Sequence, residues 1–320
     1  MAQLPKKIQD IVNKKQEYID NSRNNLEKSV VKMQETLLNK VIEDILPQLD
    51  TKNGKILNTV NNLRLIEKLD KIYNTFNINT QANVVKSIGV SLQGLNKFNN
   101  NYFTELALDD ITKKRFDSVV KSTNNQMNAS VGIDKSGNIN KGGFLDSFVN
   151  DKTLLTELKQ MVVRGVTGQQ NIANFKNEIK TKITGNDKVT GGFERYYKGF
   201  AYDIFQEYDR AYGQNMANEF NLNHAIYQGG LINGSRDFCR DHEGHVYTRD
   251  EISQFGKWTY AKAEHIEKFK DPGAQEGIPS YIEKFPNYNP FIHCGGFNCR
   301  HQLSWIPKEY AFILRPALKK

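Results

Sequence analysis

Residues 5–46 read PKKIQDIVNKKQEYIDNSRNNLEKSVVKMQETLLNKVIEDIL. Its apolar residues recur mostly at spacings of three, four or their multiples, and they are Ile8, Ile11, Ile19, Leu26, Val30, Met33, Leu37, Val41 and Ile45. This period is typical of an amphipathic helix with one apolar face. Pro5 suits a first helical turn, and Pro47 ends the pattern. The stretch therefore predicts one long helix.

More helical patterns follow. An apolar series from Ile56 to Phe76 comes directly after the turn residues 50–54 and predicts an antiparallel partner for the first helix. Helical spacing recurs near 82–104, 109–129, 144–165, 168–183 and 192–221, and a short hairpin is expected at 131–139. We therefore expect a mainly α protein with an elongated N-terminal helical arm or bundle.

The character of the sequence changes after Asn223. Short apolar pieces and turns, together with all three cysteines, replace the long helical patterns and predict a small C-terminal α+β module. The predicted organisation is a helical arm or bundle at 1–130, a helical middle region at 131–223, a small α+β Cys/His module at 224–307 and a basic tail at 308–320.

The composition limits the class of protein. Lys and Arg number 44 against 36 Asp and Glu, and this net charge of +8 indicates attraction to polyanions. No apolar run approaches the roughly 18 residues of a membrane span, and the first residues lack the apolar region of a signal peptide. We therefore expect a chain without a membrane span that is made and kept in a cytosol. Clustered cysteines there favour a metal site or inert thiols over a disulfide framework.

The candidate site joins two distant stretches, SRDFCRDHEGHVY at 235–247 and HCGGFNCRHQLSW at 293–305. In the first, Cys239 and His242 are separated by two residues, a spacing that lets both side chains face one cation. In the second, alternation along a strand at 299–306 would place both Cys299 and His301 on one face.

Two thiolates and two imidazoles make the closed tetrahedral set that is typical of structural zinc. The predicted zinc ligands are Cys239, His242, Cys299 and His301, with His293, Cys294 and His245 as reserves. Spacing alone leaves two other interpretations open, which are inert or singly hydrogen-bonded residues and a disulfide between Cys239 and Cys299.

Two further signals lie near this site. The segment Thr248-Arg249-Asp250-Glu251 fits a capping box and predicts a short helix after a strand at 245–247. The connection to the second stretch is rich in aromatic residues, for which we expect a small aromatic core rather than base stacking. These residues are Trp258, Tyr260, Phe269, Tyr281, Phe285, Tyr288 and Phe291.

These motifs resemble the Mu-like phage head-morphogenesis family, whose members are minor head proteins. The resemblance is carried by the segments 235–239, 244–247 and 295–307, and it covers roughly 150–307. Many members have a second cysteine where this chain has His242. The resemblance implies a non-enzymatic virion component that assembles in the host cytoplasm and acts in head morphogenesis. Its partners would be the portal protein or the inner capsid and packaged double-stranded DNA.

Two other functions compete with this interpretation. Asp241-His242-Glu243-Gly244-His245 would suit a metal-dependent nuclease in which an imidazole activates water beside a cation. A zinc-containing nucleic-acid-binding protein outside a virus is the other alternative. A long apolar stripe on the first helix would also need a partner, which predicts homo-oligomerisation or docking on the portal.

Overall fold

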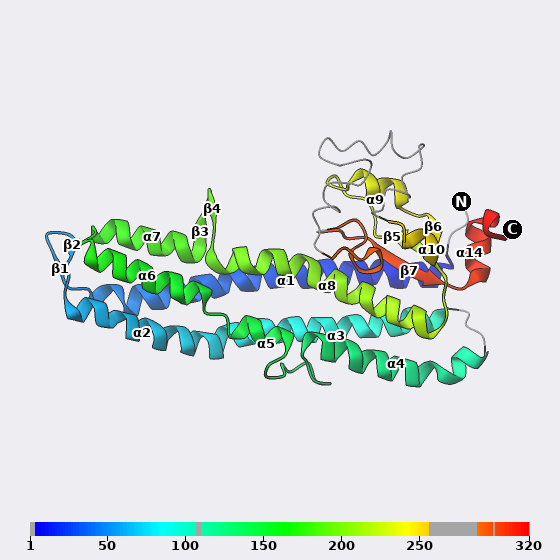
Figure 1. The fold of residues 1–320 in the computed structure, drawn as a ribbon, viewed down its shortest axis with the longest axis horizontal. Helices are drawn as coiled ribbons and strands as arrows, with labels where there is room; N and C mark the ends of the chain where they lie inside the picture. The colour runs from blue at the N-terminus through cyan, green and yellow to red at the C-terminus, as the bar shows by residue number, and fades with distance from the viewer. Residues whose placement is uncertain (1–3, 107–109, 256–286, 297, 320) are drawn as a thin grey trace. The chain divides into compact units, whose positions relative to one another are not determined.

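The computed structural model describes residues 4–106, 110–255, 287–296 and 298–319 (Figure 1). The protein is mainly helical (69%), with long N-terminal helices and small antiparallel sheets toward the C-terminus, so the predicted fold class is confirmed. No helix in the described ranges is long and apolar enough to cross a membrane.

The chain divides into two compact units. The helical unit contains residues 22–90 and 129–201, and the mixed unit contains 1–21, 91–128 and 202–320. Several long helices contribute residues to both units, so the units do not follow one another along the chain. The predicted boundaries at 130, 223 and 307 remain a prediction.

Helix α1 (Lys6–Asp44) is the long helix predicted from residues 5–46. Its buried apolar residues continue from Ile8 to Val41 at helical spacing, although Val12 is buried where the sequence pattern suggested Ile11. Pro47 lies in the short 3-10 helix η1 (Leu46–Gln48) directly after it. Proline lacks the N–H that would continue the helical hydrogen bonds, which explains the end of α1.

The helical unit turns the chain with a hairpin of β1 (Thr51–Lys52) and β2 (Lys55–Ile56). Helix α2 (Val60–Phe76) follows, and it packs against α6 (Thr153–Thr167). Helix α6 also packs against α7 (Ile172–Thr184), as Figure 1 shows. The close approach depends on Gly165, because a Cβ there would lie 2.7 Å from the Phe175 ring.

Two expected helices have different bounds. The single helix expected at 144–165 is divided into α5 (Phe144–Val149) and α6, because Asp151 accepts a hydrogen bond from the Thr153 N–H (2.8 Å) at the break. The helix expected at 168–183 begins only at Ile172, where Asn171 caps it. Such side chains compete with helical backbone bonds, a preference that apolar spacing does not reveal.

Other elements complete the helical pattern. The π-helical segment η2 (Asn77–Gln81) joins α2 to α3 (Ala82–Glu105), and α4 (Asp110–Val131) follows. A bridge between Ile133 and Ile139 closes the predicted hairpin. A second hairpin, β3 (Gly185–Asn186) with β4 (Val189–Thr190), precedes α8 (Gly192–Glu219).

Helices α3, α4 and α8 of the mixed unit are joined by asparagine and tyrosine side chains. The Tyr208 hydroxyl contacts the side-chain oxygens of Asn96 (3.0 Å) and Asn128 (3.3 Å). The Tyr212 hydroxyl bonds Asn100 and Asn124 in the same way. Buried polar groups need such partners, so part of the high asparagine content serves helix packing.

The C-terminal part of the mixed unit carries the antiparallel sheet β6–β5–β7. Its strands are β5 (His224–Gln228), β6 (Val246–Thr248) and β7 (Gln302–Ile306), and its helices are α9 (Asp237–His242), α10 (Arg249–Ile252), α13 (Pro290–His293) and α14 (Lys308–Leu314), followed by η4 (Pro316–Lys319). The predicted capping box between Thr248 and Glu251 is present. Residues 308–320 were predicted as a basic tail, but α14 and η4 make most of this segment helical.

Candidate metal centre

The central strand β5 organises the candidate site. It pairs with β6 on one side and with β7 on the other, with Ala225 opposite both Tyr247 and Trp305. All five residues of β7 are buried. The predicted strand at 299–306 therefore begins three residues late, and Cys299 and His301 lie in the segment that leads into it rather than on one face of it.

Cys239 comes from the short helix α9 and Cys299 from the loop after α13. Gly295 lies where these segments approach each other, and its N–H donates a hydrogen bond to Cys299 Sγ (3.3 Å). A Cβ at position 295 would lie 2.7 Å from Cys239 Sγ and 3.1 Å from Cys299 Sγ. Glycine is therefore required if the two sulfur atoms are to stay together.

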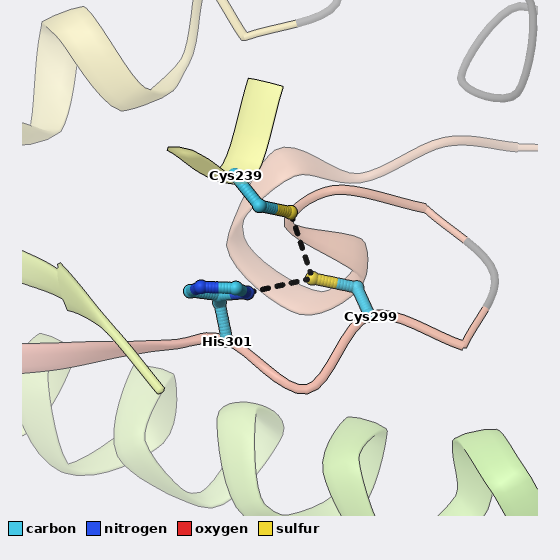
Figure 2. A group of neighbouring side chains, drawn as sticks. All are labelled: Cys239, Cys299 and His301. Carbon is cyan, nitrogen blue, oxygen red and sulfur yellow. Dashed lines mark hydrogen bonds between the residues drawn. The ribbon is translucent and has the colours of Figure 1, made fainter. Parts of the chain in front are cut away.

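Three side chains, Cys239, Cys299 and His301, converge as Figure 2 shows, and we call them the metal group. The two Sγ atoms are 3.8 Å apart, and Cys299 Sγ is 3.8 Å from His301 Nδ1. All three residues are buried, and their donor atoms lie within 4.8 Å of one another. This buried group could hold a metal ion.

The spacing agrees with tetrahedral zinc. With Zn–S bonds of about 2.3 Å and Zn–N bonds of about 2.0 Å, tetrahedral angles place two sulfurs about 3.8 Å apart and sulfur and nitrogen about 3.5 Å apart. The observed separations of 3.8 Å match the first value and lie close to the second. Two of the three donor separations therefore suit a tetrahedral ion, and the third, between Cys239 and His301, is no more than 4.8 Å.

A carboxylate lies beside His301. Its Nε2 lies 3.1 Å from Glu243 Oε2, while Nδ1 faces Cys299. Burial alone would lower the pKa of His301, but Cys299 and Glu243 together raise it. A carboxylate on the far nitrogen is a common support for a metal-binding imidazole, because it fixes both the ring and its tautomer.

The two thiols of the group differ in acidity. Burial would raise the pKa of Cys299, but hydrogen bonds with Cys239 and His301 and the charge of Arg210 hold it below the usual value for a thiol. The pKa of Cys239 is raised by its hydrogen bond to Cys299 and by burial. The surroundings of Cys299 therefore favour ionisation of this thiol over that of Cys239, and thiolates are the form that binds metal.

Arg210 on α8 holds the loop that carries these residues. Its buried guanidinium donates to the backbone oxygens of His301 (2.8 Å), Ile292 (2.8 Å) and Cys299. One side chain thus satisfies three carbonyl groups, one in α13 and two in the loop after it. Its helical position gave no sign of this role, and neither Arg210 nor Glu243 was among the predicted site residues.

The remaining predicted ligands lie outside the metal group. His242 is buried, but its Nδ1 is 2.6 Å from the Phe238 carbonyl oxygen and its ring stacks on the Phe238 ring (4.0 Å). His245 is exposed. His293 Nδ1 accepts a hydrogen bond from the Asn289 N–H (2.7 Å).

Cys294 is buried outside the metal group, and burial raises its pKa to about 12. The cysteines are free thiols, so the structure contains no Cys239–Cys299 disulfide. Of the aromatic residues noted in the connection, Phe291 stacks on Trp305 (6.1 Å) and Tyr288 approaches His293 (5.9 Å). The others, Trp258, Tyr260, Phe269, Tyr281 and Phe285, lie outside the described residues.

Comparison with known proteins adds no assignment, since no family model, curated protein or solved structure matches this chain.

Proposed function

We propose that the protein is a structural minor head protein of a tailed phage and that zinc holds its C-terminal Cys/His module together. The observation that carries the proposal is the buried metal group formed by α9 and the loop before β7. The phage assignment itself rests on the sequence resemblance at 235–247 and 295–307.

Burial favours a structural ion over a catalytic one. The exposed fractions of Cys239, Cys299 and His301 are 2%, 3% and 1%. Catalytic zinc keeps an open position for water and substrate, whereas structural zinc is enclosed by protein ligands. In its burial the metal group resembles the second kind, and this supports a non-enzymatic role over the nuclease alternative.

The proposed location is the virion head, at the portal or the inner capsid, with assembly in the host cytoplasm. The net charge of +8 would reduce repulsion from packaged double-stranded DNA. We propose the portal protein, the inner capsid, DNA and further copies of the chain as partners. Binding to DNA through this charge would weaken steeply as salt increases.

Purified phage particles test the proposal directly. Mass spectrometry of particles that encode this protein should find it in the head fraction at a few copies for each portal ring. Particles that contain the portal protein but not this chain would contradict the assignment. A nuclease assay with added divalent metal gives the opposite test, because DNA cleavage that is lost in His242→Ala would favour the enzyme.

A further inference from the structure

Tyr227 lies beside the metal group and was not among the predicted ligands. It belongs to the central strand β5, is fully buried, and places its hydroxyl 3.4 Å from Cys239 Sγ and 3.6 Å from Cys299 Sγ. The same hydroxyl is 3.3 Å from the position that a Cβ on Gly295 would occupy. The oxygen therefore faces the space between the two sulfurs.

We propose that the Tyr227 oxygen is the fourth ligand of a tetrahedral zinc site with Cys239, Cys299 and His301. This inference rests on the metal ion of the proposed function. With a Zn–O bond of about 2.0 Å and a Zn–S bond of about 2.3 Å, a tetrahedron places oxygen about 3.5 Å from each sulfur. The observed distances of 3.4 and 3.6 Å lie on either side of this value.

The backbone holds Tyr227 in place from several directions. Its N–H donates to the His245 carbonyl (3.0 Å), its carbonyl accepts from the Gly244 N–H (2.8 Å), and it pairs with Leu303 of β7. Its ring stacks on the His301 ring at a centroid distance of 5.1 Å and an interplanar angle of 16°. The oxygen and nitrogen ligands are thus fixed relative to each other before metal arrives, which reduces the cost of binding.

The charge around the site suits a phenolate ligand. Zn²⁺ with two thiolates and one phenolate carries a net charge of −1, which needs a nearby cation in a buried site. The Arg210 guanidinium supplies it, because it is buried beside the site and donates to the backbone oxygens of Cys299 and His301. Binding through the two sulfurs and the phenolate oxygen would release protons to the buffer.

His242 is the competing fourth ligand, because it was predicted from the spacing to Cys239. Its ring is held by the Phe238 carbonyl through Nδ1 and by stacking on the Phe238 ring. His242 does not belong to the group of donor atoms that lie within 4.8 Å of one another. Tyr227 already contacts both.

Cobalt(II) bound to the full-length protein is the probe that separates these ligands. The wild-type protein should show the intense visible absorption of tetrahedral cobalt. Tyr227→Phe should change the shape of this spectrum and weaken cobalt affinity by roughly tenfold or more. The control is Tyr102→Phe, which removes another buried hydroxyl of the same unit. That hydroxyl donates to the Trp305 carbonyl (2.8 Å). The Tyr102→Phe variant should keep the wild-type cobalt spectrum.

The outcomes distinguish the inference from the proposal on which it rests. Tetrahedral cobalt in the wild type with an identical spectrum in Tyr227→Phe would overturn the tyrosine ligand and keep the metal site. A spectrum altered only in His242→Ala would overturn it in favour of histidine. A folded wild-type protein that binds neither cobalt nor zinc would overturn both.

A measurement on the wild type keeps the inference testable if Tyr227→Phe does not fold. Zinc addition should produce the ultraviolet difference signal of a tyrosine that becomes phenolate, and Tyr102→Phe should give the same signal. Zinc binding without any phenolate signal would overturn the ligand assignment.

Discussion

The helical unit and the Cys/His module are stabilised in different ways. In the helical unit, α2, α6 and α7 pack through apolar side chains such as Leu69, Leu158 and Phe175. In the module, a short sheet is combined with buried thiols, imidazoles and the guanidinium of Arg210. Apolar packing tolerates substitutions that conserve volume, whereas buried polar groups lose stability when one partner is removed. The two regions should therefore respond differently to substitution.

The largest effect is expected from Cys299→Ser or Cys239→Ser. Each variant removes a thiolate ligand, so zinc affinity should fall by more than about 100-fold, beyond the usual effect of losing only a supporting partner. Limited proteolysis should then cut the Cys/His module while the helical unit stays protected. Cys294→Ser is the matched control, since Cys294 is buried outside the metal group. Equal proteolysis of all three variants and the wild type would contradict a shared metal site.

The next effect is expected from Arg210→Met. This change leaves the carbonyls of Ile292, Cys299 and His301 without their buried donor, and it should lower the free energy of unfolding by about 3 kcal/mol or more. Urea denaturation measures the loss. Arg240→Met is the control, because exposed Arg240 also donates to loop carbonyls, those of Ser235, Ile232 and Asn233, and water can replace it. Similar losses in both variants would remove the special role of Arg210.

Gly295→Ala tests the close approach of the two sulfurs without removing a ligand. The added methyl would overlap Cys239 Sγ, so the variant should lose about 1–3 kcal/mol of stability and bind zinc more weakly. Calorimetric zinc titration checks this. Gly234→Ala is the control, since a Cβ there meets nothing within 4 Å. Unchanged zinc affinity in Gly295→Ala would show that the sulfurs do not need this separation.

A glycine-to-alanine substitution in the helical unit allows a direct comparison with Gly295→Ala. Gly165→Ala would place a methyl against the Phe175 ring and should destabilise the helical unit by about 1–3 kcal/mol. Zinc content should stay at the wild-type value, because the metal group belongs to the mixed unit. Loss of zinc together with helical stability would mean that the two regions unfold as one.

The smallest effect concerns Arg315 and Glu251, whose two side chains make contacts of 2.7 Å at both carboxylate oxygens. Burial would raise the pKa of Glu251, but hydrogen bonds from Arg315 and Thr248 hold it below the usual value. Since the folded pKa is lowered, this stabilisation is present above the unfolded pKa and is lost as pH falls through the folded pKa. Arg315→Met should therefore cost about 0.5–1 kcal/mol near neutral pH and show a flatter acid dependence in thermal unfolding. If the variant loses stability in acid as steeply as the wild type, other carboxylates cause that loss.

The helices could be predicted from the sequence because apolar spacing reports local burial directly. The residues from Ile8 to Val41 revealed α1 almost to its ends. The breaks at Asp151 and Asn171 could not be read from that pattern, because they depend on single side-chain hydrogen bonds at helix ends.

The candidate site was only partly predictable. Because thiols and imidazoles are rare in the sequence, Cys239, Cys299 and His301 could be predicted as ligands. The two cysteines are nevertheless 60 positions apart in the chain. Tyr227 reads as an ordinary aromatic residue of a buried strand, and Arg210 reads as one polar position in a helix. Their roles depend on contacts between distant segments, which no local spacing encodes. Whether His242 is a ligand remains a prediction that the cobalt spectra test.

Elemental analysis of the folded, full-length protein tests the central claim most directly. Protein purified without chelators should contain about one zinc for each chain, and Cys299→Ser prepared in parallel should contain almost none. Zinc-free wild-type protein that keeps a protease-resistant Cys/His module, and whose resistance does not change when zinc is added, would contradict the claim that a metal ion holds this module together.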